Sequence, residues 1–288
     1  GYDAENIRVV ASGDVTISEK RNLGIRFASR SVYFAFIDSD AYPRADWLKN
    51  AVNQLGRSEK IWAVGGPNLS PPDDPLRRRA VGAAQKSVLV SGWRSFRKKF
   101  AGSRLCRDLP TCNLIVKREA VKIVGGFSDR LIIGEDIEFC NRIIKHHRAI
   151  LYSPEVVVFH HQRKLFRPFF RQRFIYGFSV PGIIKERREP ANFFYAVPLI
   201  FLLSLSAGFI GGLFNKTVFF IWLIVIVGYL LLVLFESIRY SFEKRDVPLI
   251  FAAITIGNLV PGIGTLASLL RISVNIKKAF AAEIVHRE

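Results

Sequence analysis

Methionine is absent from all 288 residues of the sequence, and cysteine occurs only three times. Cys106, Cys112 and Cys140 form no CxxC pair and no even-numbered set, which argues against a disulfide framework and a structural zinc site. We therefore expect three reduced thiols on the cytoplasmic side. Because even the first residue is not methionine, we expect the sequence to be a fragment or to lack its original start.

Acidic residues are absent from one long internal stretch, residues 76–107. Aromatic residues alternate there with ten basic ones, which are Arg77, Arg78, Arg79, Lys86, Arg94, Arg97, Lys98, Lys99, Arg104 and Arg107. The net charge of +18 also favours a polyanionic partner. The stretch can be a solvated surface, can stack on nucleic acid or can lie on anionic lipid. Because long apolar runs follow, we prefer membrane lipid as the partner and expect no nucleic acid.

Three apolar runs follow the basic stretch, at residues 193–213, 217–236 and 247–270. Each has about the 20 residues that a helix needs to cross a bilayer. Basic residues flank the first two runs on one side, namely Lys185, Arg187, Arg188, Arg239, Lys244 and Arg245, whereas the connection between these runs holds only Lys216. The positive-inside rule therefore predicts a multi-pass protein of the cell membrane with a cytoplasmic soluble domain.

The third apolar run permits two topologies. A full crossing places Arg271, Lys277 and Lys278 outside, against the positive-inside rule. Alternatively, the Pro-Gly-Ile-Gly sequence at 261–264 breaks the run into a re-entrant hairpin and returns the C-terminus to the cytoplasm. The sequence leaves both open.

Residues 1–190 show an alternation of strand-like and helix-like segments that indicates an α/β fold. We expect strands at 7–11, 32–37, 61–66, 113–116 and 150–159. The continuous apolar run at 32–37 suits a strand buried on both faces. We expect helices at 18–29, with Ser18 as the cap, and at 45–55 and 136–145.

Asp38 and Asp40 follow the strand at 32–37, where open α/β sheets place ligand sites. Two carboxylates separated by one residue can share a hard cation such as Mg²⁺ or Mn²⁺, which could bridge a diphosphate. The alternative is an acidic turn without a ligand. Two histidines, His160 and His161, end a later strand, and one of them can serve a metal or a phosphate.

Gly134-Glu135-Asp136 opens a predicted helix. Carboxylates at a helix N-terminus are often only favourable charges, but Asp136 can instead remove a proton from an acceptor hydroxyl. Lys20, Arg21 and Asn22 precede the Asp38 strand and can contact phosphate or a base, although a solvated helix face is the alternative.

The order of these motifs resembles that of the large family 2 glycosyltransferases, which are inverting enzymes of the GT-A fold. The matching segments are EKRNLGIRFASRSVYFAFIDSDAYPRADWLKNAV, CNLIVKREAVKIVGGFSD and IGEDIEFCNRI. A further segment, VVVFHHQRKLFRPFFRQRFIYG, is similar to the connection between catalytic domain and membrane helices in lipid-associated members. The resemblance implies a GT-A-like (Rossmann-like) nucleotide-sugar transferase domain at 1–190, followed by transmembrane helices at 191–288.

The resemblance also implies roles for individual residues. Asp38 and Asp40 become the metal and diphosphate motif, with Asp40 the preferred direct ligand. His161 stays a candidate metal ligand because of its place at the strand end. Asp136 becomes the catalytic base and Glu135 shapes the acceptor pocket, while Asn113 lies in the sugar-binding region. Lys20 and Asn22 stay substrate-binding candidates because of their position before the Asp38 strand. The family's first nucleotide-binding strand is expected to precede Gly1, so residues 1–288 alone should bind donor poorly.

The implied reaction moves sugar from a nucleotide-sugar donor to a lipid-linked glycan or surface polysaccharide. Ile175 and Tyr176 replace the Arg and Trp of the QxxRW motif, which argues against a cellulose-synthase-like processive mode. Two alternatives stay open, a polyprenyl-phosphate sugar synthase and a non-catalytic membrane scaffold with a degenerate transferase domain.

Overall fold

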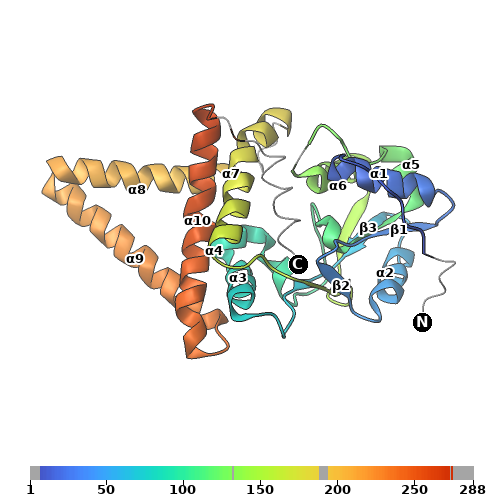
Figure 1. Ribbon diagram of the computed structural model, residues 1–288, viewed down its shortest axis with the longest axis horizontal. Coiled ribbons are helices and arrows are strands. Elements are labelled where there is room, and N and C mark those ends of the chain that lie inside the picture. Colours follow the sequence, from blue (N-terminus) through green and yellow to red (C-terminus); the bar gives the residue numbers. More distant parts are fainter. Residues whose placement is uncertain (1–6, 132, 188–193, 273, 275–288) are drawn as a thin grey trace. The chain divides into compact units, whose positions relative to one another are not determined.

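The computed structural model describes residues 7–131, 133–187, 194–272 and 274 (Figure 1). Its contacts divide the chain into two compact units, each built from two separate segments. Unit 1 comprises Gly1–Leu69 and Phe100–His160, and unit 2 comprises Ser70–Lys99 and His161–Glu288. The basic stretch thus belongs largely to the unit that holds the apolar helices. A catalytic domain ending near residue 190 stays a prediction.

Unit 1 is an α/β structure around a five-stranded mixed sheet. The strand order is β1 (Tyr33–Phe36), β6 (Leu114–Lys117), β3 (Ile61–Gly65), β7 (Ala149–Tyr152) and β5 (Arg104–Leu105). Only β3 and β7 run parallel, while the other neighbours are antiparallel. The predicted α/β class is confirmed.

A second sheet of unit 1 has the order β2 (Ala41–Pro43), β8 (Val158–His160) and β4 (Asn68–Leu69). The prediction of one strand at 150–159 is wrong, because β7 ends at Tyr152 and β8 begins only at Val158. Pro154 lies between them and has no amide hydrogen for a sheet ladder. The break moves the chain from the first sheet to the second.

Helices α1 (Ile17–Phe27), α2 (Trp47–Gly56), α5 (Arg118–Val124) and α6 (Glu135–Lys145) complete unit 1, with the 3₁₀ turn η3 (Thr111–Asn113). The predicted cap Ser18 is wrong. Thr16 accepts from the Glu19 amide, and the Glu19 carboxylate accepts from the Thr16 amide, a capping box that fixes the start of α1. Ser18 is instead buried.

Two expectations for the first strands are also wrong. Residues 7–11 form no strand, and Val9 is 92% exposed. β1 is an edge strand among the described residues, with only Phe34 buried, so it is not covered on both faces. Apolar length alone does not distinguish a central strand from an edge strand, because that depends on which segments pair with it.

The core of unit 1 lies between α2 and the sheets. Trp47, Ala51 and Leu55 of α2 pack on Val64 of β3 and Ile115 of β6. Their spacing of four residues places them on one face of the helix. This packing holds the carboxyl ends of the strands in place, and the polar motifs lie at those ends.

Unit 2 consists of helices. They are α3 (Leu76–Lys86), α4 (Val88–Ser91), η2 (Gly92–Lys98), α7 (Arg167–Arg187), α8 (Val197–Phe214), α9 (Lys216–Tyr240), η5 (Lys244–Asp246) and α10 (Val247–Leu269). Three helical segments are long and apolar enough to cross a membrane: Phe194–Phe214, Lys216–Tyr240 and Lys244–Leu269. Because α10 continues through Pro261, the re-entrant hairpin at that position is wrong.

Candidate active site

The Asp-Ser-Asp motif follows β1 and turns back at once into β2. The Ala41 amide donates to the Asp38 carbonyl at 3.1 Å, which closes the turn. β2 pairs with β8, and Ala41 lies opposite His160 in that register. This pairing places Nε2 of His160 3.2 Å from Oδ1 of Asp40.

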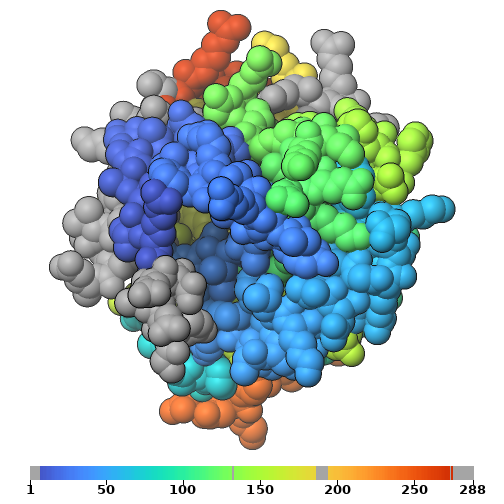
Figure 2. Space-filling view, turned by 90° about the vertical axis from the view of Figure 1, so that its right-hand side faces the viewer, coloured from blue at the N-terminus to red at the C-terminus, as the bar shows by residue number. Residues whose placement is uncertain are grey.

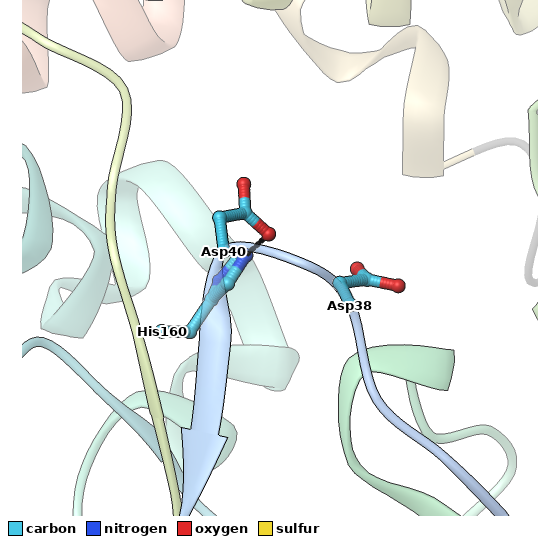
Figure 3. Close-up of side chains that lie close together, drawn as sticks. All are labelled: Asp38, Asp40 and His160. Carbon is cyan, nitrogen blue, oxygen red and sulfur yellow. Dashed lines mark hydrogen bonds and ion pairs between the residues drawn. The ribbon is translucent and has the colours of Figure 1, made fainter. Parts of the chain in front are cut away.

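Asp38, Asp40 and His160 together form a group of possible metal ligands (Figure 3). One ligand atom from each lies within 4.8 Å of the others, and all three residues are partly exposed. Carboxylate oxygens suit Mg²⁺ and Mn²⁺, while an imidazole nitrogen is a more common ligand of transition metals. The donor set therefore fits a divalent cation, and it fits Mn²⁺ better than Mg²⁺.

Arg21 of α1 joins the Asp-Ser-Asp motif to the Gly-Glu-Asp motif. Its Nη1 lies 2.5 Å from Oε1 of Glu135, and its Nη2 lies 3.4 Å from Oδ1 of Asp38. Only 14% of the Arg21 side chain and 11% of the Glu135 side chain are exposed, so solvent and salt screen this pair less than a surface pair. One guanidinium thus holds the ends of β1 and α6 together.

Phe127 of the Gly-Gly-Phe motif packs beneath this ion pair. Its ring meets Phe36 of β1 edge-on at 5.1 Å and stacks on Phe139 of α6 at 4.7 Å. Asn22 holds the main chain of Phe127 on both sides, because Nδ2 donates to its carbonyl and Oδ1 accepts from its amide, each at 2.8 Å. A Cβ on Gly126 would come within 2.3 Å of Asn22 Oδ1. The motif therefore fixes α1, β1 and α6 relative to one another.

Asp136 lies in the first turn of α6, directly after Gly134 and Glu135. Gly134, the N-cap, has a φ of 84°, which glycine adopts without strain. Withdrawal of the carboxyl group from solvent raises the pKa of Asp136 to about 7, and the charges of Glu135 and Asp108 add to the rise. Opposing it, the Ile137 amide donates to Oδ1 at 2.8 Å. A carboxylate with a pKa near neutrality is suited to general-base chemistry.

A groove of about 370 Å³ runs between α1 and the edge strand β1. Arg21, Gly24 and Ile25 of α1 line one side, and residues 33–36 line the other. Figure 2 shows the surface hollowed beside the dark-blue segment that contains α1. Arg21 thus lines this groove and also makes the two ion pairs.

The structure gives several predicted site residues other surroundings. Asn113 is fully buried: its Oδ1 accepts from Trp47 Nε1 at 2.8 Å, and its Nδ2 donates to the carbonyls of Pro67 and Val156 at 3.3 and 2.8 Å. His161 lies against the buried Asp74, with 2.6 Å between Nδ1 and Oδ1. Asn22 is occupied by Phe127, and Lys20 is exposed on α1. None of these four is brought to the group of metal ligands in the described part of the chain.

Three residues of this arrangement were missed among the predicted site residues: Arg21, His160 and Asp108. Arg21 follows Ser18 by three residues, so the two share one face of α1, and Ser18 is buried. This spacing was the available signal that Arg21 points toward the rest of unit 1. His160 was one of two adjacent histidines, and only the strand register separates them. Asp108 carries no motif, and its influence on Asp136 depends on the tertiary fold.

Comparison with known proteins identifies the family. The family described as "Glycosyl transferase family group 2" matches residues 33–265, which include both acidic motifs, α8, α9 and most of α10. The chain belongs to this family. Its unit 1 is thus part of a family 2 glycosyltransferase domain, and a family 2 protein with three apolar C-terminal helices can be anchored in a membrane.

Individual relatives share about a quarter of the aligned residues with this chain. The pre-mycofactocin glycosyltransferases of two Mycobacterium tuberculosis strains are 27% identical over 162 residues, which are 55% of this chain and 33% of each relative. The chain thus spans a third of the length of these relatives. A Methanococcus voltae protein, dolichyl N-acetyl-alpha-D-glucosaminyl phosphate 3-beta-D-2,3-diacetamido-2,3-dideoxy-beta-D-glucuronosyltransferase, is 25% identical over 258 residues, 85% of this chain and 72% of the relative.

Proposed function

We propose that this chain carries the catalytic centre of a membrane-bound inverting glycosyltransferase of GT-A-like fold. It moves a sugar from a nucleotide-sugar donor to a lipid-linked glycan or a surface polysaccharide, with the help of Mn²⁺ or Mg²⁺. The observation that carries the proposal is the double ion pair of Arg21, which joins the Asp38 and Glu135 motifs in a chain of this family. A metal-binding motif and a candidate base thereby share one end of one sheet.

Asp38, Asp40 and His160 would hold the divalent cation. When bound, such a cation neutralises negative charge on a diphosphate leaving group. Asp40 is paired with His160 Nε2, which orients its carboxylate, while Asp38 is paired with Arg21. The chain's own cation at Arg21 therefore lies beside the same motif and adds positive charge where a donor diphosphate would bind.

Asp136 acts as the general base in this proposal. Because its pKa lies near 7, it is largely ionised at slightly alkaline pH and still basic enough to take a hydroxyl proton. Attack by the deprotonated acceptor from the face opposite the diphosphate inverts the anomeric centre. Glu135 neutralises Arg21 and borders Asp136, so it shapes the acceptor side of the site.

The proposed acceptor is attached to a membrane lipid. The name of the M. voltae relative includes a dolichyl phosphate-linked sugar, and this chain has three helices apolar enough to cross a bilayer. Anchoring the domain in the same membrane raises the local concentration of such an acceptor. The domain is proposed to be cytoplasmic, because basic residues flank α8 and α9 on the side away from Lys216.

The test uses membranes containing the full-length protein and a panel of labelled nucleotide sugars with Mn²⁺ or Mg²⁺. We expect label in a lipid or glycan fraction with wild type, a large loss with Asp136→Asn, and no loss with Asp14→Asn, an exposed carboxylate of unit 1. Equal incorporation by Asp136→Asn would instead indicate a phosphate acceptor, which is already ionised, as in a polyprenyl-phosphate sugar synthase. No incorporation with any donor would favour a membrane scaffold.

A further inference from the structure

The three apolar helices of unit 2 differ in how much of each the protein itself covers. Only 6% of the most apolar window is buried in the α8 segment and in α9, whereas 50% is buried in the α10 segment. α8 and α9 are apolar all round and exposed, as expected for helices in lipid. One side of α10, by contrast, is covered by other parts of the protein along most of its length. The segments that cover it must lie at the same depth in the membrane as α10.

The principal neighbour of α10 is α7, which lies beside it over several turns (Figure 1). Phe169 packs with Ile250 and Ile254, and further along a Cβ on Gly177 would come within 1.9 Å of the Pro261 carbonyl. α7 is not among the candidate spans, and its first two turns carry Arg167, Arg171, Gln172 and Arg173. If α10 crossed the bilayer, this charged helix would be carried into the hydrocarbon with it.

Arg173 makes the conflict specific. Its Nη2 donates to the Gly257 carbonyl at 2.9 Å, near the middle of α10. Val90 of α4 packs against the same glycine, because a Cβ there would come within 2.9 Å of a Val90 methyl. If α10 spanned the bilayer, the Arg173 guanidinium and α4, which belongs to the basic stretch 76–107, would lie near the bilayer midplane. A charged group at that depth is strongly unfavourable.

The contacts of α8 and α9 show how α10 is oriented relative to them. The first turn of α8 contacts α10, because a Cβ on Gly262 would meet the Pro198 carbonyl. The last turns of α9 contact α10 at a second point, where Val233 packs with Ile250. These two points lie about 18 Å apart along α10. The other ends of α8 and α9 meet each other instead, through Phe209 and Trp222 at 5.4 Å.

The three helices therefore form a triangle with α10 as its base. At a rise of 1.5 Å per residue, α8 is about 27 Å long, and α9 from Lys216 to its contact at Val233 is also about 27 Å long. A triangle with a base of about 18 Å and these sides has α8 and α9 about 40° apart, each standing at about 70° to α10. Because spanning helices tilt from the membrane normal by 0–40°, α8 and α9 can both cross a bilayer, but α10 cannot cross it with them.

We propose that only the α8–α9 hairpin crosses the bilayer and that α10 lies along the membrane surface, binding the headgroup and upper acyl region. α3, α4 and α7 cover its other side. Both ends of the hairpin then lie on one side of the membrane, and Phe214 at its tip, 86% exposed, reaches the opposite side.

The charges of unit 2 agree with this orientation. Cations gather around the base of the triangle, where Arg79 pairs with Asp246 at 3.5 Å, and Lys86 and Lys99 lie over the rings of Phe242 and Tyr240. A surface-bound α10 also keeps Arg271 on this side, as the positive-inside rule requires. Anionic lipid headgroups are the chemistry that suits this cationic base.

The inference rests on the membrane association in the proposed function but not on transferase activity. The first test is cysteine labelling in the full-length protein with Cys106→Ser, since Cys112 and Cys140 are buried. A membrane-impermeant maleimide is applied to spheroplasts and to inverted vesicles. We expect Phe214→Cys to react only in spheroplasts, and Lys244→Cys and Leu270→Cys only in inverted vesicles. Reaction of Leu270→Cys in spheroplasts would overturn the proposal.

The second test measures depth with nitroxide labels at Leu259, Ile263 and Leu270, which are spaced by four and seven residues and thus share a face. We expect all three at one shallow depth by oxygen and nickel-chelate accessibility. A matched series on α8, at Ile200, Leu203 and Ile210, should change depth steadily. If α10 spanned the bilayer, Leu259 and Leu270 would instead differ in depth by up to about 16 Å.

Discussion

Unit 1 has two polar centres that are built in opposite ways. Around Asn113, every side-chain group that can bond is paired inside the protein, and the residue has no exposed surface. Around Arg21, which pairs with Asp38 and with Glu135 next to Asp136, the side chains of Asp38 and Asp40 remain partly exposed at the end of the sheet. A closed centre can only stabilise the fold, because it offers no group to a ligand. The open centre retains atoms that can bind or react.

The two adjacent histidines repeat the contrast on a smaller scale. His160 lies against Asp40, whose side chain is 16% exposed and has a second carboxylate nearby. His161 lies against Asp74, whose side chain is 2% exposed. Adjacency in the sequence therefore carries little information about role; the surroundings of the partner carboxylate decide it.

The largest effect is expected in the open centre at Asp136. Asp136→Asn should lower kcat/KM by about 10²–10⁴-fold, as for removal of a general base. In wild type, kcat/KM should rise with pH and level off above about pH 7, since the ionised form is the base. The variant should lose that rise, and a pH profile on labelled donor measures it.

The same substitution should raise stability at alkaline pH. The native pKa of Asp136 lies above its unfolded value, so the native state holds a proton that the unfolded state releases between about pH 4 and 7. Stability from this group is therefore present at low pH and is lost as pH rises through 7. Asp136→Asn should melt higher than wild type at pH 8 and show little difference at pH 4. A lower melting temperature at pH 8 would contradict the raised pKa.

Asp40→Asn should lower the metal-dependent part of the activity by about 10²–10³-fold, because it weakens the binding of a cation whose charge stabilisation is worth several kcal/mol. The melting temperature without added metal should change little, since Asp40 is partly exposed. Activity titrated with Mn²⁺ and a melting curve distinguish this result from misfolding, which would lower both.

The adjacent histidines provide a matched pair with a smaller effect. His160→Asn should raise the Mn²⁺ concentration for half-maximal activity by about 10-fold, whereas His161→Asn should leave it unchanged. Equal shifts in the two variants would remove His160 from the proposed metal site and would blur the contrast between them.

The smallest effect on activity is expected in the closed centre. Asn113→Ala leaves Trp47 Nε1 and two carbonyls without their partner, which costs about 1–3 kcal/mol of stability. The Mn²⁺ requirement of the folded fraction should not change. Asn50→Ala, which removes a surface hydrogen bond to the Glu155 carbonyl, is the control and should change stability by less than about 0.5 kcal/mol.

Much of the open centre could be predicted from the sequence, because local patterns determine it. The apolar run before Asp38 did form a strand, and Glu135 and Asp136 did open a helix. The choice between His160 and His161 could not be predicted, since it depends on the register of β8 against β2, and a shift of one residue exchanges the two faces. The burial of Asn113 and the edge position of β1 were missed for the same reason, because they depend on partners distant in the sequence.

The long sequence separation within unit 2 also has a consequence for how the protein is made. The apolar face of α3, with Ala80, Val81 and Ala84, packs on Ile250 and Ile254 of α10, about 170 residues later in the chain. At 5–20 residues per second, a ribosome needs roughly 10–35 s to supply that partner. Until then, the apolar face of this basic helix lacks its α10 partners and can pack only on the members of the cluster made earlier, Val90, Leu165, Phe169 and Val233. Translation that stops before α10 therefore leaves a product prone to aggregation and suited to recognition by chaperones.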